Sequence, residues 1–213
     1  GQPVLVAFRP GGVAAPLQDA LGRAVEARRT RGDTEASVAS TARLGRNVVV
    51  AAGAVICAHC RIADNSILNT ASIVDHESLI GRAAHICPGA RLAGRVTVDD
   101  FATLGGYTLV HQFCAIGAYA FTAFGSVISK DVPPYLTVAG NPARARGLNR
   151  EGLKRHAFPD ATQKALQQAY RALYRSGGSR DELLEKLRQQ ARQDTHVGQL
   201  LEFLEQHQRG IIR

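Results

Sequence analysis

The sequence predicts an all-β, left-handed parallel β-helix of about five coils, followed by a C-terminal α-helical domain. Two observations predict the β-helix: aliphatic residues recur every six positions from residue 38, and small residues recur every six positions from residue 36. A third observation predicts the helical domain, because near the C-terminus the apolar residues change to the spacing of amphipathic helices.

The aliphatic series is almost unbroken: fifteen of its sixteen residues are Val, Leu or Ile, and Thr122 is the exception. The series is Val38, Leu44, Val50, Ile56, Ile62, Leu68, Val74, Ile80, Ile86, Leu92, Val98, Leu104, Val110, Ile116, Thr122 and Ile128. The small series is Ala36, Ala42, Val48, Ala54, Cys60, Ser66, Ser72, Ser78, Ala84, Ala90, Val96, Ala102, Thr108, Cys114, Ala120 and Ser126. Six is a multiple of the strand period of two and not of the helix period of 3.6, so each hexapeptide is predicted to be a short strand and a tight turn.

Three such strands make one triangular coil of about 18 residues, in which the aliphatic side chain fills the prism and the small one fits near a corner. Each coil buries its face only against its neighbours, as solenoid proteins require. An ordinary β-sandwich is the alternative, but its strands would come at irregular spacing. We therefore expect a β-helix over residues 34–135.

The residues before the β-helix are predicted to form an N-terminal cap. Residues 3–8 have the pattern of a strand and residues 14–29 that of a helix, so residues 1–33 would cover the first coil. A fragment of a nucleotide-binding unit is the alternative, although no GxGxxG motif is present.

The residues after the β-helix, 136–213, are predicted to form the helical domain. Asp160 can cap the first long helix, and Ser179 with Glu182 has the pattern of a capping box for the second. The predicted helices lie at about residues 161–175, 179–193 and 195–208.

Composition limits the classes of partner. A net charge of +8 suits anionic partners such as phosphorylated substrates or an acidic carrier protein, whereas 6% aromatic residues and no arginine-rich tail give no reason to expect nucleic-acid binding. With no membrane span and no signal-peptide pattern, we expect a cytoplasmic protein. Cys57 and Cys60 form a single CxxC motif, but Cys60 belongs to the small series that is expected to be buried. We therefore interpret this cysteine as a packing residue and expect no metal site.

From about residue 98 onward the chain resembles the UDP-N-acetylglucosamine O-acyltransferase of lipid A biosynthesis, a branch of the hexapeptide-repeat acyltransferases. The matching segments are VHQF at 110–113, DVPPY at 131–135, GNP at 140–142, GLNREGLKR at 147–155, AYRALYRSG at 169–177 and RGIIR at 209–213. The stretch at 147–155 and the helical tail are specific to that branch.

From about residue 34 to residue 94 the chain is more similar to a second branch, the sialic-acid O-acetyltransferases and UDP-amino-sugar N-acetyltransferases. The matching segments are ARLG at 42–45, NTASIVDHE at 69–77 and AHICPGARLAG at 84–94. The chain therefore combines features of two branches, whether by natural descent or by engineering.

Acyl transfer from a thioester needs a base for the nucleophile's proton and donors for the oxyanion. The resemblance to both branches implies that His76 is the base, and the following Glu77 can fix the imidazole tautomer and stabilise its cation. Gly94 lies 18 residues after His76, which is one full coil, so it should stack over His76. The resemblance implies that its backbone N–H is an oxyanion donor.

The resemblance also implies substrate-binding residues. His85 matches a ligand-contacting histidine of the acetyltransferase branch, and His111 and Gln112 match substrate contacts of the lipid A branch. Arg95 departs from the lipid A branch, which has histidine after the glycine.

The stretch at 147–155 supplies the remaining substrate-binding residues, Asn149, Glu151 and Arg155, of which Arg155 would meet an anionic donor or phosphate. Phe121 and Phe124 match the floor of the acyl-chain groove, where two bulky rings suggest a short acyl group such as acetyl. Packing between coils is the alternative role for these rings.

The members of this superfamily form trimers with active sites between subunits, so we expect a homotrimer. The leading hypothesis is transfer of an acyl group from acyl carrier protein to a UDP-linked amino sugar, with no tightly bound cofactor. The alternatives are a sugar O- or N-acetyltransferase that uses acetyl-CoA, and a β-helix scaffold without catalysis.

Overall fold

The structure, a computed structural model, describes residues 35–175, 179–207 and 210–213. The predicted N-terminal cap of residues 1–33, with its strand and helix, lies outside the described residues.

Two-residue strands follow one another at six-residue intervals from Ser37 to Ile128, as the two series of residues predict. They are β1 (Ser37–Val38), β2 (Arg43–Leu44), β3 (Val49–Val50), β4 (Val55–Ile56), β5 (Arg61–Ile62), β6 (Ile67–Leu68), β7 (Ile73–Val74), β8 (Leu79–Ile80), β9 (His85–Ile86), β10 (Arg91–Leu92), β11 (Thr97–Val98), β12 (Thr103–Leu104), β13 (Leu109–Val110), β14 (Ala115–Ile116), β15 (Phe121–Thr122) and β16 (Val127–Ile128).

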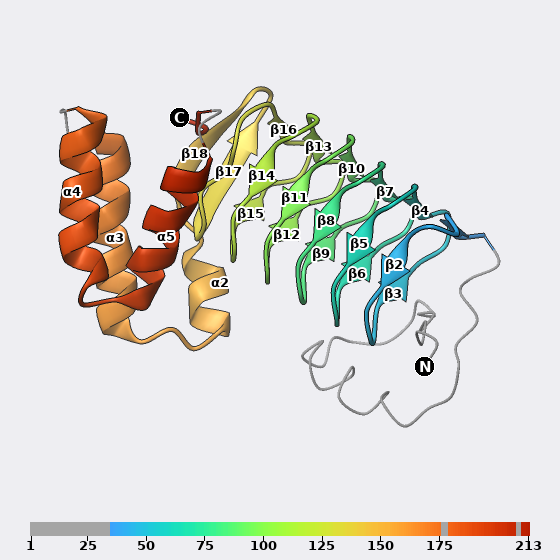
Figure 1. The fold of residues 1–213 in the computed structure, drawn as a ribbon, viewed down its shortest axis with the longest axis horizontal. Coiled ribbons are helices and arrows are strands. Elements are labelled where there is room, and N and C mark those ends of the chain that lie inside the picture. The colour runs from blue at the N-terminus through green and yellow to red at the C-terminus, as the bar shows by residue number, and fades with distance from the viewer. Residues whose placement is uncertain (1–34, 176–178, 208–209) are drawn as a thin grey trace.

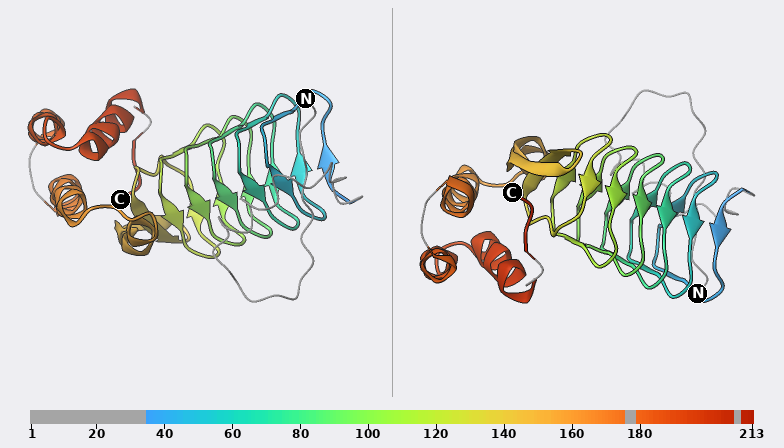
Figure 2. Two further views of the ribbon diagram at one scale, coloured as in Figure 1. Left: turned by 90° about the horizontal axis from the view of Figure 1, so that it is seen from below. Right: turned by 90° about the horizontal axis from the view of Figure 1, so that it is seen from above.

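These strands form three parallel sheets, which are the three faces of a prism (Figures 1 and 2). Sheet A has the order β1-β4-β7-β10-β13-β16, sheet B has β14-β11-β8-β5-β2, and sheet C runs from β3 through β6, β9 and β12 to β15. Each strand pairs with the strand 18 residues away, as in Ile73↔Arg91 and Arg91↔Leu109. Three strands make one coil, so β1–β16 complete five coils and begin a sixth. The predicted parallel β-helix is confirmed.

The aliphatic series lines the interior of the prism, where residues such as Leu68, Ile86 and Leu104 are 0% exposed. Its one polar member, Thr122, is equally buried, and its hydroxyl lies 2.7 Å from the Thr108 hydroxyl and 3.0 Å from the Gly105 N–H. Those contacts satisfy the polar group that breaks the pattern.

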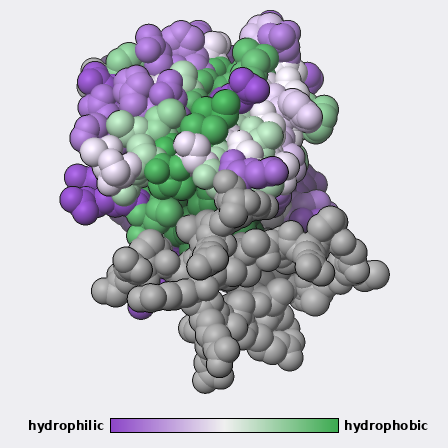
Figure 3. Space-filling model, turned by 90° about the vertical axis from the view of Figure 1, so that its right-hand side faces the viewer, coloured by the Kyte–Doolittle hydropathy of each residue, from purple (hydrophilic) through white to green (hydrophobic). Residues whose placement is uncertain are grey.

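The small series is buried from Val48 to Ser126, whereas Ala36 and Ala42 in the first coil are only partly buried. Cys60 and Cys114 are buried, as their register predicts. The N-terminal end of the prism faces the viewer in Figure 3, and apolar side chains gather there. Of the first strands, Val38 in β1 is 39% exposed and Leu44 in β2 is partly buried against the core.

Sheet C continues beyond the two-residue strands. β17 (Leu136–Gly140) pairs with β15 in parallel, and β18 (Ala143–Leu148) pairs with β17 in antiparallel fashion. Among the described residues the first helix therefore begins at Arg150, whereas the sequence placed the start of the helical domain at residue 136. Leu136 and Val138 are buried and alternate with Thr137, which is the period of a strand.

The helices are α2 (Arg150–Arg155), α3 (Asp160–Arg175), α4 (Arg180–Ala191) and α5 (Thr195–Gln206). The predicted capping box is present, since the Ser179 hydroxyl accepts from the Glu182 N–H and the Glu182 carboxylate accepts from the Ser179 N–H. Along the described chain, no helix has the length and apolar character needed to cross a membrane.

The long helices α3, α4 and α5 lie at the C-terminal end of the β-helix (Figure 1) and share a second apolar core. Tyr135, at the end of the last coil, is fully buried in this core. Its hydroxyl hydrogen-bonds to the side chains of His196 and Gln199 on α5, and its ring contacts that of Phe158. This residue therefore fixes the helices against the prism.

Candidate active site

Four successive turns stack where sheet A meets sheet B, at residues 57–60, 75–78, 93–96 and 111–114. We call this corner the A/B edge. The Glu77 N–H donates to the Ala58 carbonyl at 2.9 Å, and the Arg95 N–H donates to the His76 carbonyl at 2.9 Å. Each turn is thus held on the previous one at a spacing of 18 residues.

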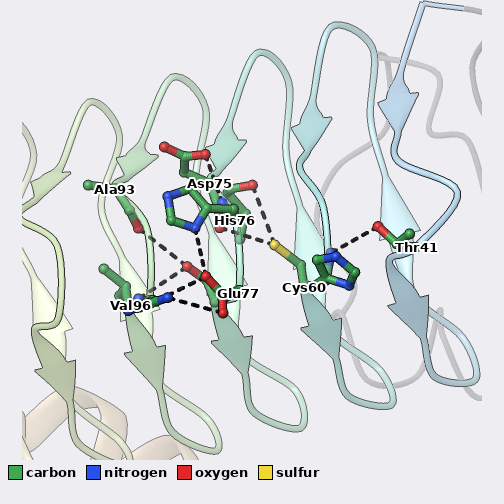
Figure 4. Close-up of polar contacts among 11 residues, drawn as sticks. Thr41, Cys60, Asp75, His76, Glu77, Ala93 and Val96 are labelled. Carbon is green, nitrogen blue, oxygen red and sulfur yellow. Dashed lines mark hydrogen bonds and ion pairs between the residues drawn. The ribbon is translucent and has the colours of Figure 1, made fainter.

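His76 projects from this edge with a half-exposed side chain. Its backbone N–H donates to Asp75 Oδ1 at 2.7 Å, and its ring Nδ1 lies 3.2 Å from Glu77 Oε2, as Figure 4 shows. A carboxylate at Nδ1 favours the tautomer with the proton on that nitrogen. The lone pair is then on Nε2, which is the atom that a general base uses.

Gly94 lies against the opposite side of the same ring. A Cβ built at Gly94 would come within 2.5 Å of His76 Nε2 and 2.6 Å of Cε1, closer than real Cβ atoms approach. The predicted stacking of Gly94 over His76 is therefore present, and only glycine leaves room for the ring. Among the hydrogen bonds of the described residues, the Gly94 N–H has no backbone acceptor.

Glu77 contacts two cationic or basic groups at once. Arg95 Nε lies 3.0 Å from Glu77 Oε2, and Arg95 Nη2 lies 3.4 Å from Oε1. The Arg95 guanidinium, and after it the His76 ring, lower the pKa of the Glu77 carboxyl. An ionised carboxylate at this position can stabilise the His76 ring when it takes up a proton.

His111 and Gln112 lie on the same A/B edge, one coil beyond Gly94. The Phe113 N–H donates to the Gly94 carbonyl at 3.2 Å, which holds this turn on the one that contains Gly94. Nδ1 of His111 lies 3.0 Å from the Gln112 carbonyl oxygen. The structure therefore brings five of the predicted residues together: His76, Glu77, Gly94, His111 and Gln112.

His85 and Phe121 lie elsewhere in the chain, on the outer face of sheet C, where both are in register with Thr103. His85 Nε2 is 3.4 Å from Asn69 Nδ2, and burial lowers the pKa of the His85 imidazole. Phe124 lies at the corner between sheets C and A, is 75% exposed, and contacts Tyr107 edge-on with ring centroids 5.5 Å apart.

The substrate-binding residues predicted on α2 lie at the third corner, between sheets B and C. Asn149 caps α2 by accepting from the Gly152 N–H, and its Nδ2 donates to the Tyr119 carbonyl at 2.9 Å. Glu151 and Arg155 are exposed on this helix. Within one chain, α2 and His76 are therefore on different corners of the prism.

Sequence reasoning missed the contact of Arg95 with Glu77. The available signal was the spacing, since Arg95 follows Glu77 by 18 residues and carries the opposite charge. The same spacing produces the ion pairs Arg46–Asp64 at 3.0 Å and Arg82–Asp100 at 3.2 Å. The 18-residue coil thus predicts side-chain pairs as well as backbone register.

Comparison with known proteins supports both sequence resemblances. Residues 131–212 match the family model described as Udp N-acetylglucosamine O-acyltransferase, Domain 2. The acyl-[acyl-carrier-protein]–UDP-N-acetylglucosamine O-acyltransferase of Pseudomonas paraeruginosa is 42% identical over 156 residues, which are 73% of this chain and 60% of that protein. The chain thus spans about three fifths of the length of the curated relatives that it matches.

Several solved structures have related folds. LpxA from Acinetobacter baumannii matches with a TM-score of 0.71 at 22% identity, covering 85% of this chain and 96% of that one. PerB from Caulobacter crescentus, solved in complex with CoA and GDP-perosamine, matches with a TM-score of 0.53 at 38% identity, covering 54% of this chain and 55% of that one. The six-residue ladder and the stacked turns are features that this chain shares with hexapeptide-repeat acyltransferases, to which it is similar in sequence and fold.

Proposed function

We propose that this chain is an acyltransferase that moves an acyl group from an acyl carrier protein thioester to a UDP-linked amino sugar. The observation that carries the proposal is the placement of the His76 ring, with Nδ1 on the Glu77 carboxylate and Nε2 facing Gly94. A base and a backbone N–H donor side by side are what acyl transfer requires.

In the proposed mechanism, His76 Nε2 removes the proton from the acceptor hydroxyl or amine as that group attacks the thioester carbonyl. The new bond gives a tetrahedral intermediate whose oxyanion the Gly94 N–H stabilises. The carbon–sulfur bond then breaks, and the His76 imidazolium returns the proton to the departing thiolate. The Glu77 carboxylate stabilises the imidazolium throughout.

The proposal includes a homotrimer, because the site on one chain lacks α2. His111 and Gln112 would contact the acceptor from the A/B edge, while Asn149, Glu151 and Arg155 would reach it from a neighbouring subunit. The exposed Arg155 guanidinium suits an anionic phosphate. We further propose that the protein acts in the cytoplasm.

Transfer of a short acyl group from acetyl-CoA to an amino sugar is the second candidate function. It is favoured by the similarity to PerB, which was solved with CoA and GDP-perosamine. The exposed ring of Phe124 and the half-buried ring of Phe121 agree with a short acyl group. His85, on the same face as Phe121, would then contact the donor.

The test is thioester turnover with acyl carrier protein thioesters and with acetyl-CoA, on UDP-amino-sugar acceptors, for the parent and His76→Ala. His59→Ala is the matched control, because His59 is an exposed histidine on the same A/B edge. Turnover that is lost in His76→Ala and retained in His59→Ala supports the role of His76. Equal turnover in the parent and His76→Ala overturns it, use of acetyl-CoA alone selects the second candidate, and no turnover with any donor indicates a scaffold.

A further inference from the structure

One oxygen of Glu77 serves two partners. Oε2 lies 3.2 Å from His76 Nδ1 and 3.0 Å from Arg95 Nε, while Oε1 lies 3.4 Å from Arg95 Nη2. Two contacts from one planar guanidinium to the two oxygens of a carboxylate define the plane of that carboxylate. Arg95 therefore determines which way the Glu77 oxygens face.

Arg95 is itself held in place. Its backbone N–H donates to the His76 carbonyl, and its guanidinium lies 5.7 Å from the centre of the Phe113 ring in the next turn. Glu77, Arg95 and Phe113 occupy the same position in three successive turns, so the coil spacing stacks carboxylate, guanidinium and ring along the A/B edge. The contacts therefore follow from the regular stacking of the coils.

The other coil-spaced ion pairs show what is particular about this one. In Arg46–Asp64 and Arg82–Asp100, the aspartate Oδ1 also accepts the backbone N–H of its arginine, at 2.8 and 2.7 Å. Those carboxylates close the turn on the previous coil. Glu77 has the imidazole of His76 as its second partner instead.

We propose that Arg95 is a positioning residue of the acyl-transfer site, which acts on His76 through Glu77. By holding the Glu77 carboxylate toward Nδ1, Arg95 keeps the proton on Nδ1 and the lone pair on Nε2, beside Gly94. The kinetic consequence rests on the proposed function, whereas the effect on the His76 tautomer does not. Half-exposed ion pairs contribute little to stability, so the role of this one is orientation.

Direct binding of an anionic substrate is the competing role for Arg95. The substitution Arg95→Lys distinguishes this role from the positioning role. A lysine ammonium keeps the charge but cannot contact both Glu77 oxygens in one plane. If Arg95 positions Glu77, Arg95→Lys behaves largely like Arg95→Ala. If Arg95 only attracts an anion, Arg95→Lys behaves largely like the parent.

The first experiment reads the His76 ring nitrogens by NMR in the full chain labelled with ¹⁵N-histidine, with His76→Ala to assign the signals. Above the pH range in which the imidazole titrates, the parent is expected to show one tautomer, protonated on Nδ1, and Arg95→Ala a mixture of both. Arg82→Ala is the matched control, because it removes an ion pair of the same spacing at another corner. A parent-like spectrum in Arg95→Ala overturns the proposal, even if the chain has no acyltransferase activity.

The second experiment applies to the active protein and uses a double-mutant cycle. We expect Arg95→Ala to lower kcat by about tenfold with little change in KM. In a Glu77→Gln background the same substitution should have almost no further effect, because the residue through which Arg95 acts is already altered. A raised KM with unchanged kcat, or an undiminished effect in the Glu77→Gln background, overturns the proposal in favour of direct substrate contact.

Discussion

The imidazole of His76 lies so close to Gly94 that a Cβ at Gly94 would come within 2.5 Å of Nε2. The two residues are 18 positions apart, so the length of one coil creates this contact. Because the ring occupies the space of the absent side chain, Gly94 has a steric role that is separate from the proposed donor role of its N–H.

Substituting Gly94→Ala should therefore displace the His76 ring. We expect turnover to fall by about a hundredfold or more, because the base and the oxyanion donor lose their alignment. The measurement is kcat with the best thioester donor, together with the thermal midpoint. Gly198→Ala, in the first turn of α5, is the control, since its Cβ would meet only Ala191 Cβ at 3.9 Å. Unchanged turnover in Gly94→Ala would show that the ring position has no catalytic importance.

The lowered pKa of Glu77 predicts a pH-dependent contribution to stability. A carboxyl whose pKa is lower in the folded than in the unfolded state stabilises the fold at pH values above its unfolded pKa, which for glutamate is 4.5. That contribution is lost as the pH falls through the lower folded value. Because Glu77 is solvent-exposed, the effect is small: the parent should be slightly more stable than Glu77→Gln at pH 6, and the difference should shrink toward pH 3. Urea unfolding at both pH values measures it, and a difference that grows on acidification contradicts the prediction.

Thr122 tests how the prism interior accommodates a polar group. Its hydroxyl is fully buried and pairs with that of Thr108 at 2.7 Å, so Thr122→Val should leave the Thr108 hydroxyl without this partner. We expect a loss of about 1–3 kcal/mol in the free energy of unfolding. Replacing both residues by valine should restore much of that loss, because no orphan hydroxyl remains. If the double variant is less stable than Thr122→Val, the hydroxyl pair is not the cause.

Much of the fold could be predicted from the sequence because each six-residue repeat forms one short strand and one turn. The register of Gly94 over His76 follows from the same spacing. The hairpin of β17 and β18 was missed, since Leu136 and Val138 come after two prolines and lie outside the six-residue series. The separation of α2 from His76 was not predictable either, because spacing along a coil does not say at which corner a later helix packs.

Phe124 allows the acyl-length hypothesis to be tested without disturbing the fold. Its ring is 75% exposed and contacts Tyr107, so Phe124→Ala should change the thermal midpoint little. If the ring ends the acyl groove, the variant should use longer acyl donors relatively better than the parent does. The measurement is kcat/KM across donors of increasing chain length, with Tyr107→Ala as control. An unchanged length preference would leave Phe124 with a packing role only.

The position of α2 at a different corner from His76 makes the trimer proposal testable by complementation. If a site combines His76 of one subunit with Arg155 of the next, His76→Ala and Arg155→Ala chains should each be inactive alone. Mixed trimers assembled at random would contain one intact site in about four, so up to about a quarter of the parent activity should return. The measurement is turnover after the two variants are unfolded and refolded together, with separately refolded variants mixed afterwards as control. If both residues acted within one chain, every mixed trimer would remain inactive, because no chain in it carries both side chains.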